Sequence, residues 1–112
     1  MGRIRGGTKP ETKLQRKIVD FLKARDWDVR VTHGNEFQSG FPDLYCCHLK
    51  YGSRWIDVKM PTGYSLTNAQ MEVWPAWASK GVGVWILTAA SETEYAKLFK
   101  PANFMWYLGV MK

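Results

Sequence analysis

Apolar residues recur at helical spacing near the start of the chain and at alternating spacing soon afterwards. The helical set lies on one face and consists of Leu14, Ile18, Phe21 and Leu22. Thr8 and Glu11 have the spacing of an N-terminal capping box, so the sequence predicts a helix that ends near residue 25 or 26. The alternating set that follows predicts a strand over 28–33.

Two apolar stretches in the middle of the chain predict a β-hairpin. A loop over 34–42 precedes the first stretch, 43–49, and a short turn at 51–53 separates it from the second, 54–59. Strands joined by so short a turn pair antiparallel. We therefore expect the start of the first strand to lie beside the end of the second.

The second half of the chain alternates helix and strand signals. Thr67 and Gln70 repeat the capping pattern and predict a helix to about Lys80, with a bend or an early end at Pro75. The remaining segments are an apolar strand over 82–88, a helix over 91–100, and an aromatic tail over 104–110 that either packs on the sheet or forms an interface. The predicted order is α-β-β-β-α-β-α, an α/β fold with a mixed β-sheet flanked by helices.

Length and composition fit one globular domain. The chain has 112 residues, of which 46% are hydrophobic, and we expect a flexible basic arm over 1–8 and a single domain over 9–112. No apolar run reaches the length of a membrane span, and no apolar segment follows the basic N-terminus as in a secretory signal. Adjacent strand residues such as Cys46 and Cys47 are poor disulfide partners, so we expect a cytoplasmic protein.

The positive charge of the chain is concentrated in its first 25 residues. The net charge is +6, and residues 1–25 carry all of this excess, with eight basic and two acidic side chains. A concentrated basic element is typical of a protein that binds a phosphate backbone, although a solvated helix face with a loose basic tail is the alternative. The candidate DNA-binding residues are Arg3, Arg5, Lys9, Lys13, Arg16 and Lys17.

The predicted hairpin brings two carboxylates and a lysine together. Asp57 and Lys59 lie two residues apart and therefore project from one face of a strand. Asp43 opens the partner strand directly after Pro42, so its carboxylate is expected near that of Asp57. Two close carboxylates repel each other unless a cation lies between them, and Mg²⁺ prefers such oxygen ligands. Lys59 could then hold the attacking water or a phosphate oxygen.

Pro42-Asp43 followed by Asp57-Val58-Lys59 resembles the PD-(D/E)xK nuclease motif. With its surroundings, the pattern is similar to the VRR-NUC family, which occurs as stand-alone phage and bacterial domains, over residues 8–88. The resemblance implies a restriction-endonuclease-like fold and a Mg²⁺- or Mn²⁺-dependent deoxyribonuclease, a homodimer that cuts branched DNA such as four-way (Holliday) junctions in repair or recombination. The implied metal ligands are Asp43, Asp57, the carbonyl of Val58, and Glu11; the implied catalytic residues also include Lys59 and Gln70.

Each of these residues also has a simpler interpretation. Glu11 and Gln70 could serve only to cap their helices, and Asp57 with Lys59 could be an exposed ion pair. The family more often has glutamate where this chain has Asp57, which puts the metal distance and preference in question. Two other functions remain open: a nuclease for flaps, single strands or duplex DNA, and a non-catalytic DNA-binding module of the same fold.

Overall fold

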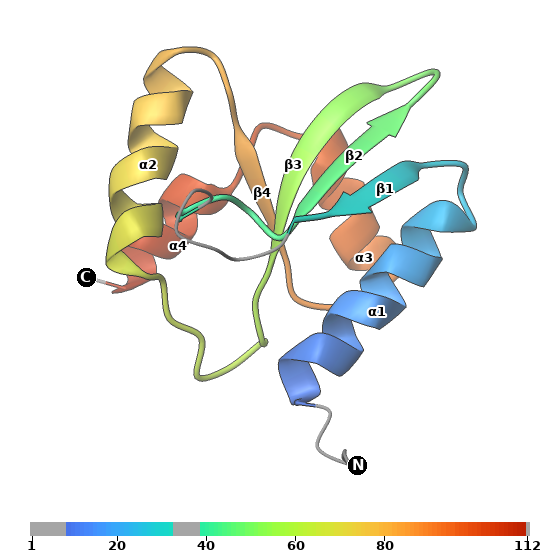
Figure 1. Cartoon of the computed structure of the whole chain (residues 1–112), viewed down its shortest axis with the longest axis horizontal. Helices are drawn as coiled ribbons and strands as arrows, with labels where there is room; N and C mark the ends of the chain where they lie inside the picture. The colour runs from blue at the N-terminus through green and yellow to red at the C-terminus, as the bar shows by residue number, and fades with distance from the viewer. Residues whose placement is uncertain (1–8, 33–38, 112) are drawn as a thin grey trace.

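The computed structural model describes residues 9–32 and 39–111, which form a four-stranded sheet with helices on both faces (Figure 1). Along the chain the elements are α1 (Pro10–Lys23), β1 (Asp28–Val31), β2 (Leu44–His48), β3 (Gly52–Val58), α2 (Asn68–Ser79), β4 (Val84–Leu87), α3 (Glu92–Tyr95), the 3₁₀ helix η2 (Ala96–Phe99) and α4 (Phe104–Met111). None of these helices is long and apolar enough to cross a bilayer, within the described residues.

The sheet is mixed, as predicted. Its strand order is β1-β2-β3-β4; the first three strands pair antiparallel, and β4 pairs parallel to β3 after the crossover through α2. The predicted hairpin of β2 and β3 is confirmed, but its turn lies at 49–51 and β3 begins earlier than expected, at Gly52. Gly52 has φ +83°, which favours glycine at the end of this turn.

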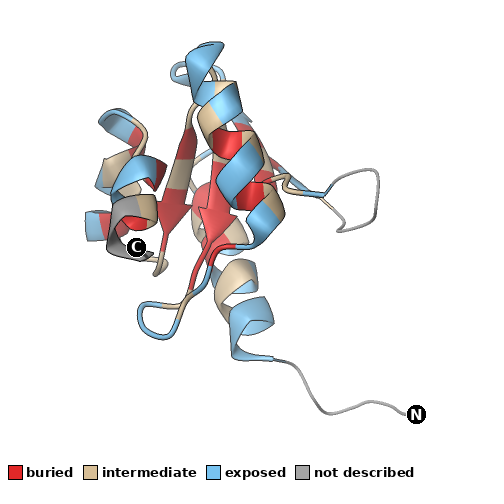
Figure 2. Cartoon of the chain, turned by 90° about the vertical axis from the view of Figure 1, so that its left-hand side faces the viewer, coloured by how far each residue is buried: buried red, intermediate tan, exposed pale blue. Residues whose placement is uncertain are grey.

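Each face of the sheet has its own apolar core. On one face, α1, α3 and η2 cover side chains that include Leu44, Ile56 and Val58. On the other, α2 and α4 cover Val84 and Ile86, and burial is concentrated on the strands and the inward sides of the helices (Figure 2). Because side chains alternate along β3, the residues at 55 and 57 face α2, while those at 56 and 58 face α1.

The start of α1 differs from the predicted capping box. The N-cap residue is Lys9, whose side chain makes no capping hydrogen bond, and Pro10 occupies the first helical position. Thr8 lies outside the described residues, and the helix begins one position later than a Thr8 cap requires. Proline at this position needs no backbone donor and has its φ already fixed for a helix, which explains the start without a side-chain cap.

The start of α2 follows the prediction closely. The Thr67 hydroxyl accepts from the backbone N–H of Gln70 at 3.0 Å, and the Gln70 side chain accepts from the backbone N–H of Thr67 at 3.1 Å. The expected early end at Pro75 is wrong, because the helix continues to Ser79. Trp74 beside it is fully buried, and packing of this side chain offsets the hydrogen bond that proline removes.

The C-terminal segment packs on the sheet instead of extending away from it. The helix predicted over 91–100 divides into α3 and η2, and α4 buries Phe104 and Tyr107 in the core shared with α2. Asn103, just before α4, accepts from the backbone N–H of Ile86 and donates to its carbonyl oxygen. This side chain satisfies the free edge of β4 as a further strand would.

Candidate active site

The register of the β2–β3 hairpin places Asp43 beside Asp57. Leu44 pairs with Ile56, so the residue before Leu44 meets the residue after Ile56. The backbone N–H of Asp43 donates to Asp57 Oδ1 at 3.1 Å, and the backbone N–H of Val58 donates to Asp43 Oδ2 at 2.8 Å. Each carboxylate is therefore held by the backbone of the opposite strand, and both are fixed on a rigid sheet.

Lys59 lies between Asp57 and the first turn of α2. Its Nζ is 3.1 Å from Asp57 Oδ2 and donates to Gln70 Oε1 at 3.0 Å. The same Oε1 atom accepts from the backbone N–H of Thr67, so the helix cap and the lysine share one acceptor. Capping and contact with Lys59, weighed as alternatives for Gln70 from the sequence, are both present. The lysine backbone N–H continues the sheet ladder to Leu87 O at 3.1 Å, which fixes the base of its side chain.

The ion pair of Asp57 and Lys59 is buried and is not a surface pair. Asp57 is 1% exposed and Lys59 is 8% exposed. Burial, and to a lesser extent the negative charge of Asp43, raise the pKa of Asp57 to about 7 against the opposing effect of Lys59. Burial is also the main reason why the pKa of Asp43 is raised. A close pair of carboxylates, of which Asp57 is buried and Asp43 half-buried, is typical of a site built to bind a cation or a proton.

Asp43, Asp57 and Lys59 form a cluster in which one carboxylate oxygen lacks a hydrogen-bond donor among the described residues. Asp57 Oδ2 is buried, and although Lys59 Nζ lies close to it, the angles are those of an ion pair and not of a hydrogen bond. A buried carboxylate oxygen left without a donor costs free energy unless an ion, a water or a proton completes its surroundings. The electrostatics and the hydrogen bonding thus lead to the same expectation of a missing partner.

The raised carboxyl pKa values predict that the metal-free protein loses stability as the pH rises from about 4 to 7. In that range Asp57 and Asp43 hold protons more strongly in the folded chain than in the unfolded chain, so unfolding releases protons. The free energy of unfolding should fall by up to about 1.4 kcal/mol per pH unit for each titrating group. Urea unfolding in EDTA at pH 5, 6, 7 and 8 checks this. A free energy of unfolding that rises between pH 5 and 7 would contradict it, and Asp57→Asn should flatten the slope.

Glu11 shares a small polar cavity with the carboxylate pair. The cavity has a volume of about 180 Å³ and is lined by Lys9, Glu11, Thr12, Gln15, Asp43 and Val58. Glu11 is exposed at the start of α1 and its charge contributes to raising the pKa of Asp43. Over 9–32 and 39–111, no three His, Cys, Asp or Glu side chains converge on one point that could hold a metal ion. The structure therefore joins Asp43 to Asp57 and places Glu11 at the same cavity without bringing its carboxylate into the cluster.

The donor set fits a hard divalent cation. Asp43, Glu11 and Val58 line one polar cavity, and Asp57 accepts a hydrogen bond from the backbone of Asp43. The expected donors are all oxygen atoms. The unmatched Asp57 Oδ2 and the raised carboxyl pKa values are the features that a cation would relieve. Water and a phosphate group would complete the ligands of such an ion, since Mg²⁺ keeps several waters in protein sites.

The basic residues predicted to contact DNA lie on the outer face of α1. Lys9, Lys13, Arg16 and Lys17 are all exposed, whereas Ile18 and Leu22 of the same helix are buried against the sheet. A further hollow of about 330 Å³ between α1 and the segment after β3 includes Lys13 and Lys17 in its lining. Arg3 and Arg5 lie outside the described residues.

Contacts that fix the loop before Asp43 were not evident from the sequence. Trp74 Nε1 donates to Gly40 O at 2.7 Å, which ties this loop to α2. Gly40 has φ +85°, and a Cβ there would lie 3.0–3.2 Å from Val73 and Ala69. The sequence signal for this close approach was only the Gly-Phe-Pro-Asp string itself, which also fits an ordinary turn.

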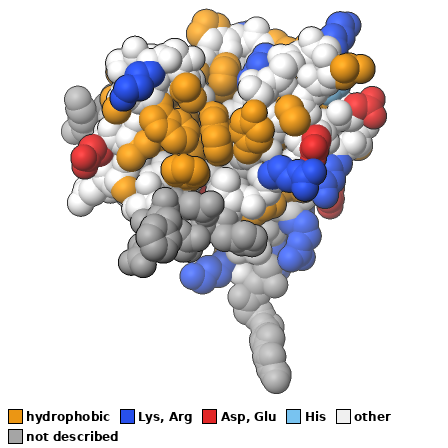
Figure 3. Space-filling model, turned by 45° about the horizontal axis from the view of Figure 1, so that its top comes forward, with side chains coloured by type: hydrophobic (Ala, Val, Ile, Leu, Met, Phe, Trp, Pro, Cys, Tyr) orange, Lys and Arg blue, Asp and Glu red, His pale blue; other side chains and the backbone are white. Residues whose placement is uncertain are grey.

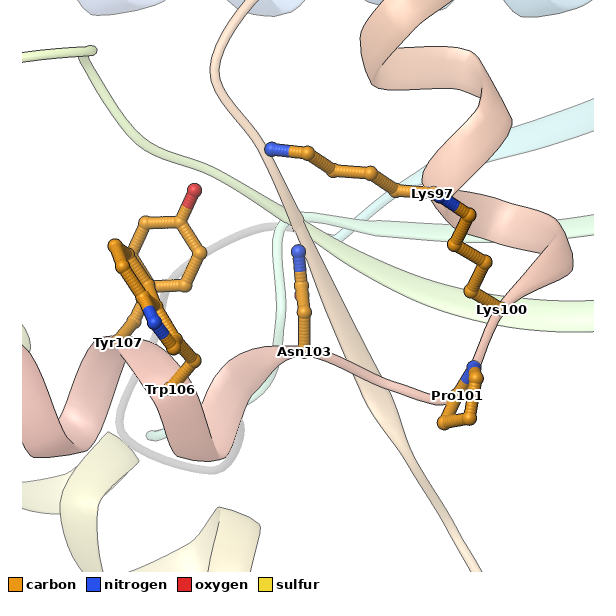
Figure 4. Close-up of a pocket in the computed structure, with 6 residues that line it drawn as sticks. All are labelled: Lys97, Lys100, Pro101, Asn103, Trp106 and Tyr107. Atoms are coloured by element: carbon orange, nitrogen blue, oxygen red, sulfur yellow. The ribbon is translucent and has the colours of Figure 1, made fainter.

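A larger cavity, of about 390 Å³, shares no lining residue with the carboxylate site. It lies between η2 and α4 and is lined by Lys97, Lys100, Pro101, Asn103, Trp106 and Tyr107 (Figure 4). Lys97 Nζ forms an ion pair with Glu94 Oε2 at 2.6 Å, and the Asn103 side chain accepts a hydrogen bond from the backbone of Ile86 on β4. The side chains of Lys97 and Asn103 thus have structural roles, and volume alone does not make this cavity the functional site.

Comparison with known proteins identifies the fold. No family model matches the sequence, and no curated protein matches it. Among solved structures, the chain is similar to one described as a "VRR_NUC domain", with a TM-score of 0.64 and 19% sequence identity over 74% of this chain and 88% of that chain. The chain has the VRR_NUC fold, so the predicted restriction-endonuclease-like architecture is confirmed.

Proposed function

We propose that this chain is a metal-dependent nuclease that hydrolyses phosphodiester bonds in DNA. The observation that supports this proposal best is the buried cluster of Asp43, Asp57 and Lys59 on two paired strands, with the lysine held by Gln70. This arrangement has the spacing of the PD-(D/E)xK motif on a chain with the VRR_NUC fold. A surface ion pair would need neither the burial nor the second carboxylate.

Asp43, Asp57, the carbonyl of Val58 and Glu11 would hold Mg²⁺ or Mn²⁺. When bound, such an ion supplies a nucleophilic water near neutral pH and stabilises negative charge on the phosphate. The chain's own contribution is to fix these donors: the hairpin register sets the two aspartates, and α1 carries Glu11 to the same cavity.

Lys59 would contact the attacking water or a phosphate oxygen. Its ammonium carries three protons, of which one points to Gln70 and another is accounted for by the ion pair with Asp57. The third proton would be donated to the substrate. Holding a cation rigidly where negative charge develops is among the largest single contributions to catalysis.

The exposed basic residues of α1 would bind the DNA backbone near this site. Lys9 lines the carboxylate cavity itself, and Lys13 and Lys17 line the neighbouring hollow. Contacts of this kind give affinity that falls with salt and carry no sequence information. We propose four-way junctions as the substrate and a homodimer as the active form, and both proposals rest on the resemblance to VRR-NUC domains.

A panel of end-labelled DNAs tests the proposed activity. Four-way junction, flap, single strand and matched linear duplex are each incubated with the purified chain and Mg²⁺ or Mn²⁺. Symmetric nicks confined to the junction support the dimeric junction-cutting enzyme, while cutting of the other DNAs keeps the nuclease and overturns the junction preference. Tight, salt-sensitive binding without cleavage of any DNA overturns the nuclease and leaves a binding module.

Gln70 is proposed as a positioning residue for Lys59. Gln70→Ala should lower kcat about tenfold, because Lys59 loses one of its two fixed contacts, while KM changes little. The variant should also lose roughly 1 kcal/mol of stability with the helix cap. Steady-state kinetics and urea unfolding measure the two effects. Glu72→Ala, at an exposed site on the same helix, is the control, and an unchanged kcat in Gln70→Ala would contradict the positioning role.

A further inference from the structure

Four aromatic side chains form a continuous cluster over the two strands that lead to the carboxylates. This aromatic platform consists of Phe41, Tyr45, Trp55 and Trp77. Neighbouring ring centroids lie 4.7–5.8 Å apart, in tilted or edge-to-face pairs. All four side chains are half-buried, and Figure 3 shows a broad hydrophobic patch on this side of the molecule.

The platform rests on the core but is not sealed by it. Trp55 and Trp77 pack against the buried cluster under α2, so their positions are fixed. Their outer sides line a hollow of about 270 Å³ with Lys80 and Val82, and a second hollow of about 240 Å³ shares Trp55 and Val82 and includes Tyr45.

The platform is a direct continuation of the strands that carry the carboxylates. Tyr45 lies two residues after Asp43 on β2, and Trp55 lies two residues before Asp57 on β3. Two residues along a strand span about 7 Å and return to the same face of the sheet. Tyr45 and Trp55 therefore lie about one nucleotide's length along the strands from the two aspartates, and a DNA strand bound at the carboxylates could reach them.

The charges around the platform favour a polyanion. Neither hollow has an acidic residue in its lining, while Lys80 and Arg54 line one hollow each. The Arg54 guanidinium is occupied by backbone carbonyls, including those of Leu98 and Ser53. Lys80 is exposed and forms no ion pair with any residue of the described segments, so its ammonium is available to a phosphate.

We propose that the aromatic platform stacks unpaired bases of the DNA next to the cleaved bond. This inference rests on the proposed nuclease function and narrows its substrate to a junction whose branch point is opened, so that unpaired nucleotides lie beside the reacting phosphate. Aromatic faces bind bases of any identity, because every base has a π surface, and a nearby cation holds the backbone. Fully paired DNA keeps its bases inside the stack and cannot use the platform.

Binding of fluorescent oligonucleotides to the full chain tests the proposal. The affinities for a 20-nucleotide oligothymidylate and for a 20-base-pair duplex are measured in Ca²⁺ or EDTA by anisotropy, for wild type, Tyr45→Ala, Trp77→Ala and the matched Tyr45→Phe and Trp77→Phe. Trp106→Ala is the control, because Trp106 is 65% exposed and lies outside the platform. Sedimentation of each protein reports its oligomeric state, and cleavage by wild type is assayed separately.

Both alanine variants should bind the oligothymidylate about 5-fold to 100-fold more weakly than wild type. Their affinity for the duplex should stay near that of wild type, and the phenylalanine variants should bind both DNAs about as wild type does. Unchanged single-strand affinity, or an equal loss for both DNAs, would overturn the proposal while leaving wild-type cleavage intact. Loss of a wild-type dimer without loss of single-strand affinity would assign the surface to a second copy of the chain instead.

A variant that fails to fold is replaced by a measurement on the wild-type chain. An oligonucleotide carrying 5-iodouracil is photocrosslinked to the protein, and the attached residues are mapped by mass spectrometry. Crosslinks at Tyr45, Trp55 or Trp77 are expected, and crosslinks confined to other residues would overturn the proposal. Absence of cleavage by wild type on every DNA would instead count against the nuclease function itself.

Discussion

Replacing Lys59 with alanine is expected to lower the rate of DNA cleavage by about 10²–10³-fold while DNA binding persists. Lys59 is the positive group at the cluster, held by Asp57 and Gln70 and only 8% exposed. A cation kept in place before the reaction begins stabilises developing charge without reorganisation, so its loss affects the transition state more than the ground state. The basic face of α1 is unchanged in this variant and should keep the DNA bound.

Single-turnover cleavage with enzyme in excess measures the rate, and anisotropy in Ca²⁺ measures binding. Lys50→Ala removes an exposed lysine at the tip of the β2–β3 hairpin and should cleave at the wild-type rate. Circular dichroism establishes that both variants are folded. A Lys59→Ala variant that cleaves within threefold of wild type would remove the lysine from the proposed chemistry.

Asp43→Asn is expected to abolish the stabilisation of the folded chain by divalent cations. Asparagine keeps an oxygen that accepts from the backbone N–H of Val58, so the hairpin register should survive. The change removes one of two adjacent negative charges, which eliminates the attraction for a cation and relieves the repulsion of Asp57. The metal-free variant should therefore be more stable than wild type at pH 8, and it should not cleave DNA.

Thermal unfolding with increasing Mn²⁺ at pH 8 measures this effect. Wild type should gain about 2.7 kcal/mol at a metal concentration 100-fold above Kd, which corresponds to a rise in Tm of about 10 °C. The Tm of Asp43→Asn should not change, whereas Asp20→Asn, at an exposed site on α1, should respond as wild type does. Equal metal-dependent shifts in wild type and Asp43→Asn would show that the ion binds elsewhere.

The features that could be predicted from sequence are those set by local patterns. Alternation along β3 predicted that Asp57 and Lys59 project from one face, and the short hairpin connection predicted that Asp43 would lie near Asp57. The capping box at Thr67 required only four consecutive residues, and the structure contains it. Adjacent strand residues were expected on opposite faces, and Cys46 is buried while Cys47 is exposed.

The features that could not be predicted depend on packing between distant segments. Pro75 does not end α2, because contacts of the neighbouring Trp74 outweigh local propensity. Glu11 was expected among the metal ligands, but the distance of its carboxylate from the aspartates depends on how the whole of α1 lies on the sheet. The aromatic platform joins a loop, two strands and a helix, and no single stretch of sequence contains it.

Cleavage of DNA by the wild-type chain with and without a divalent cation tests the assignment of Asp43, Asp57 and Lys59 most directly. The chain is incubated with a 5′-labelled branched DNA in Mg²⁺, Mn²⁺, Ca²⁺ or EDTA, and the products are resolved at single-nucleotide length. Cleavage in Mg²⁺ or Mn²⁺ that stops in EDTA, and that Asp57→Asn abolishes, is the expected result. Cleavage that persists in EDTA or in Asp57→Asn, or DNA binding without cleavage in any metal, would contradict it.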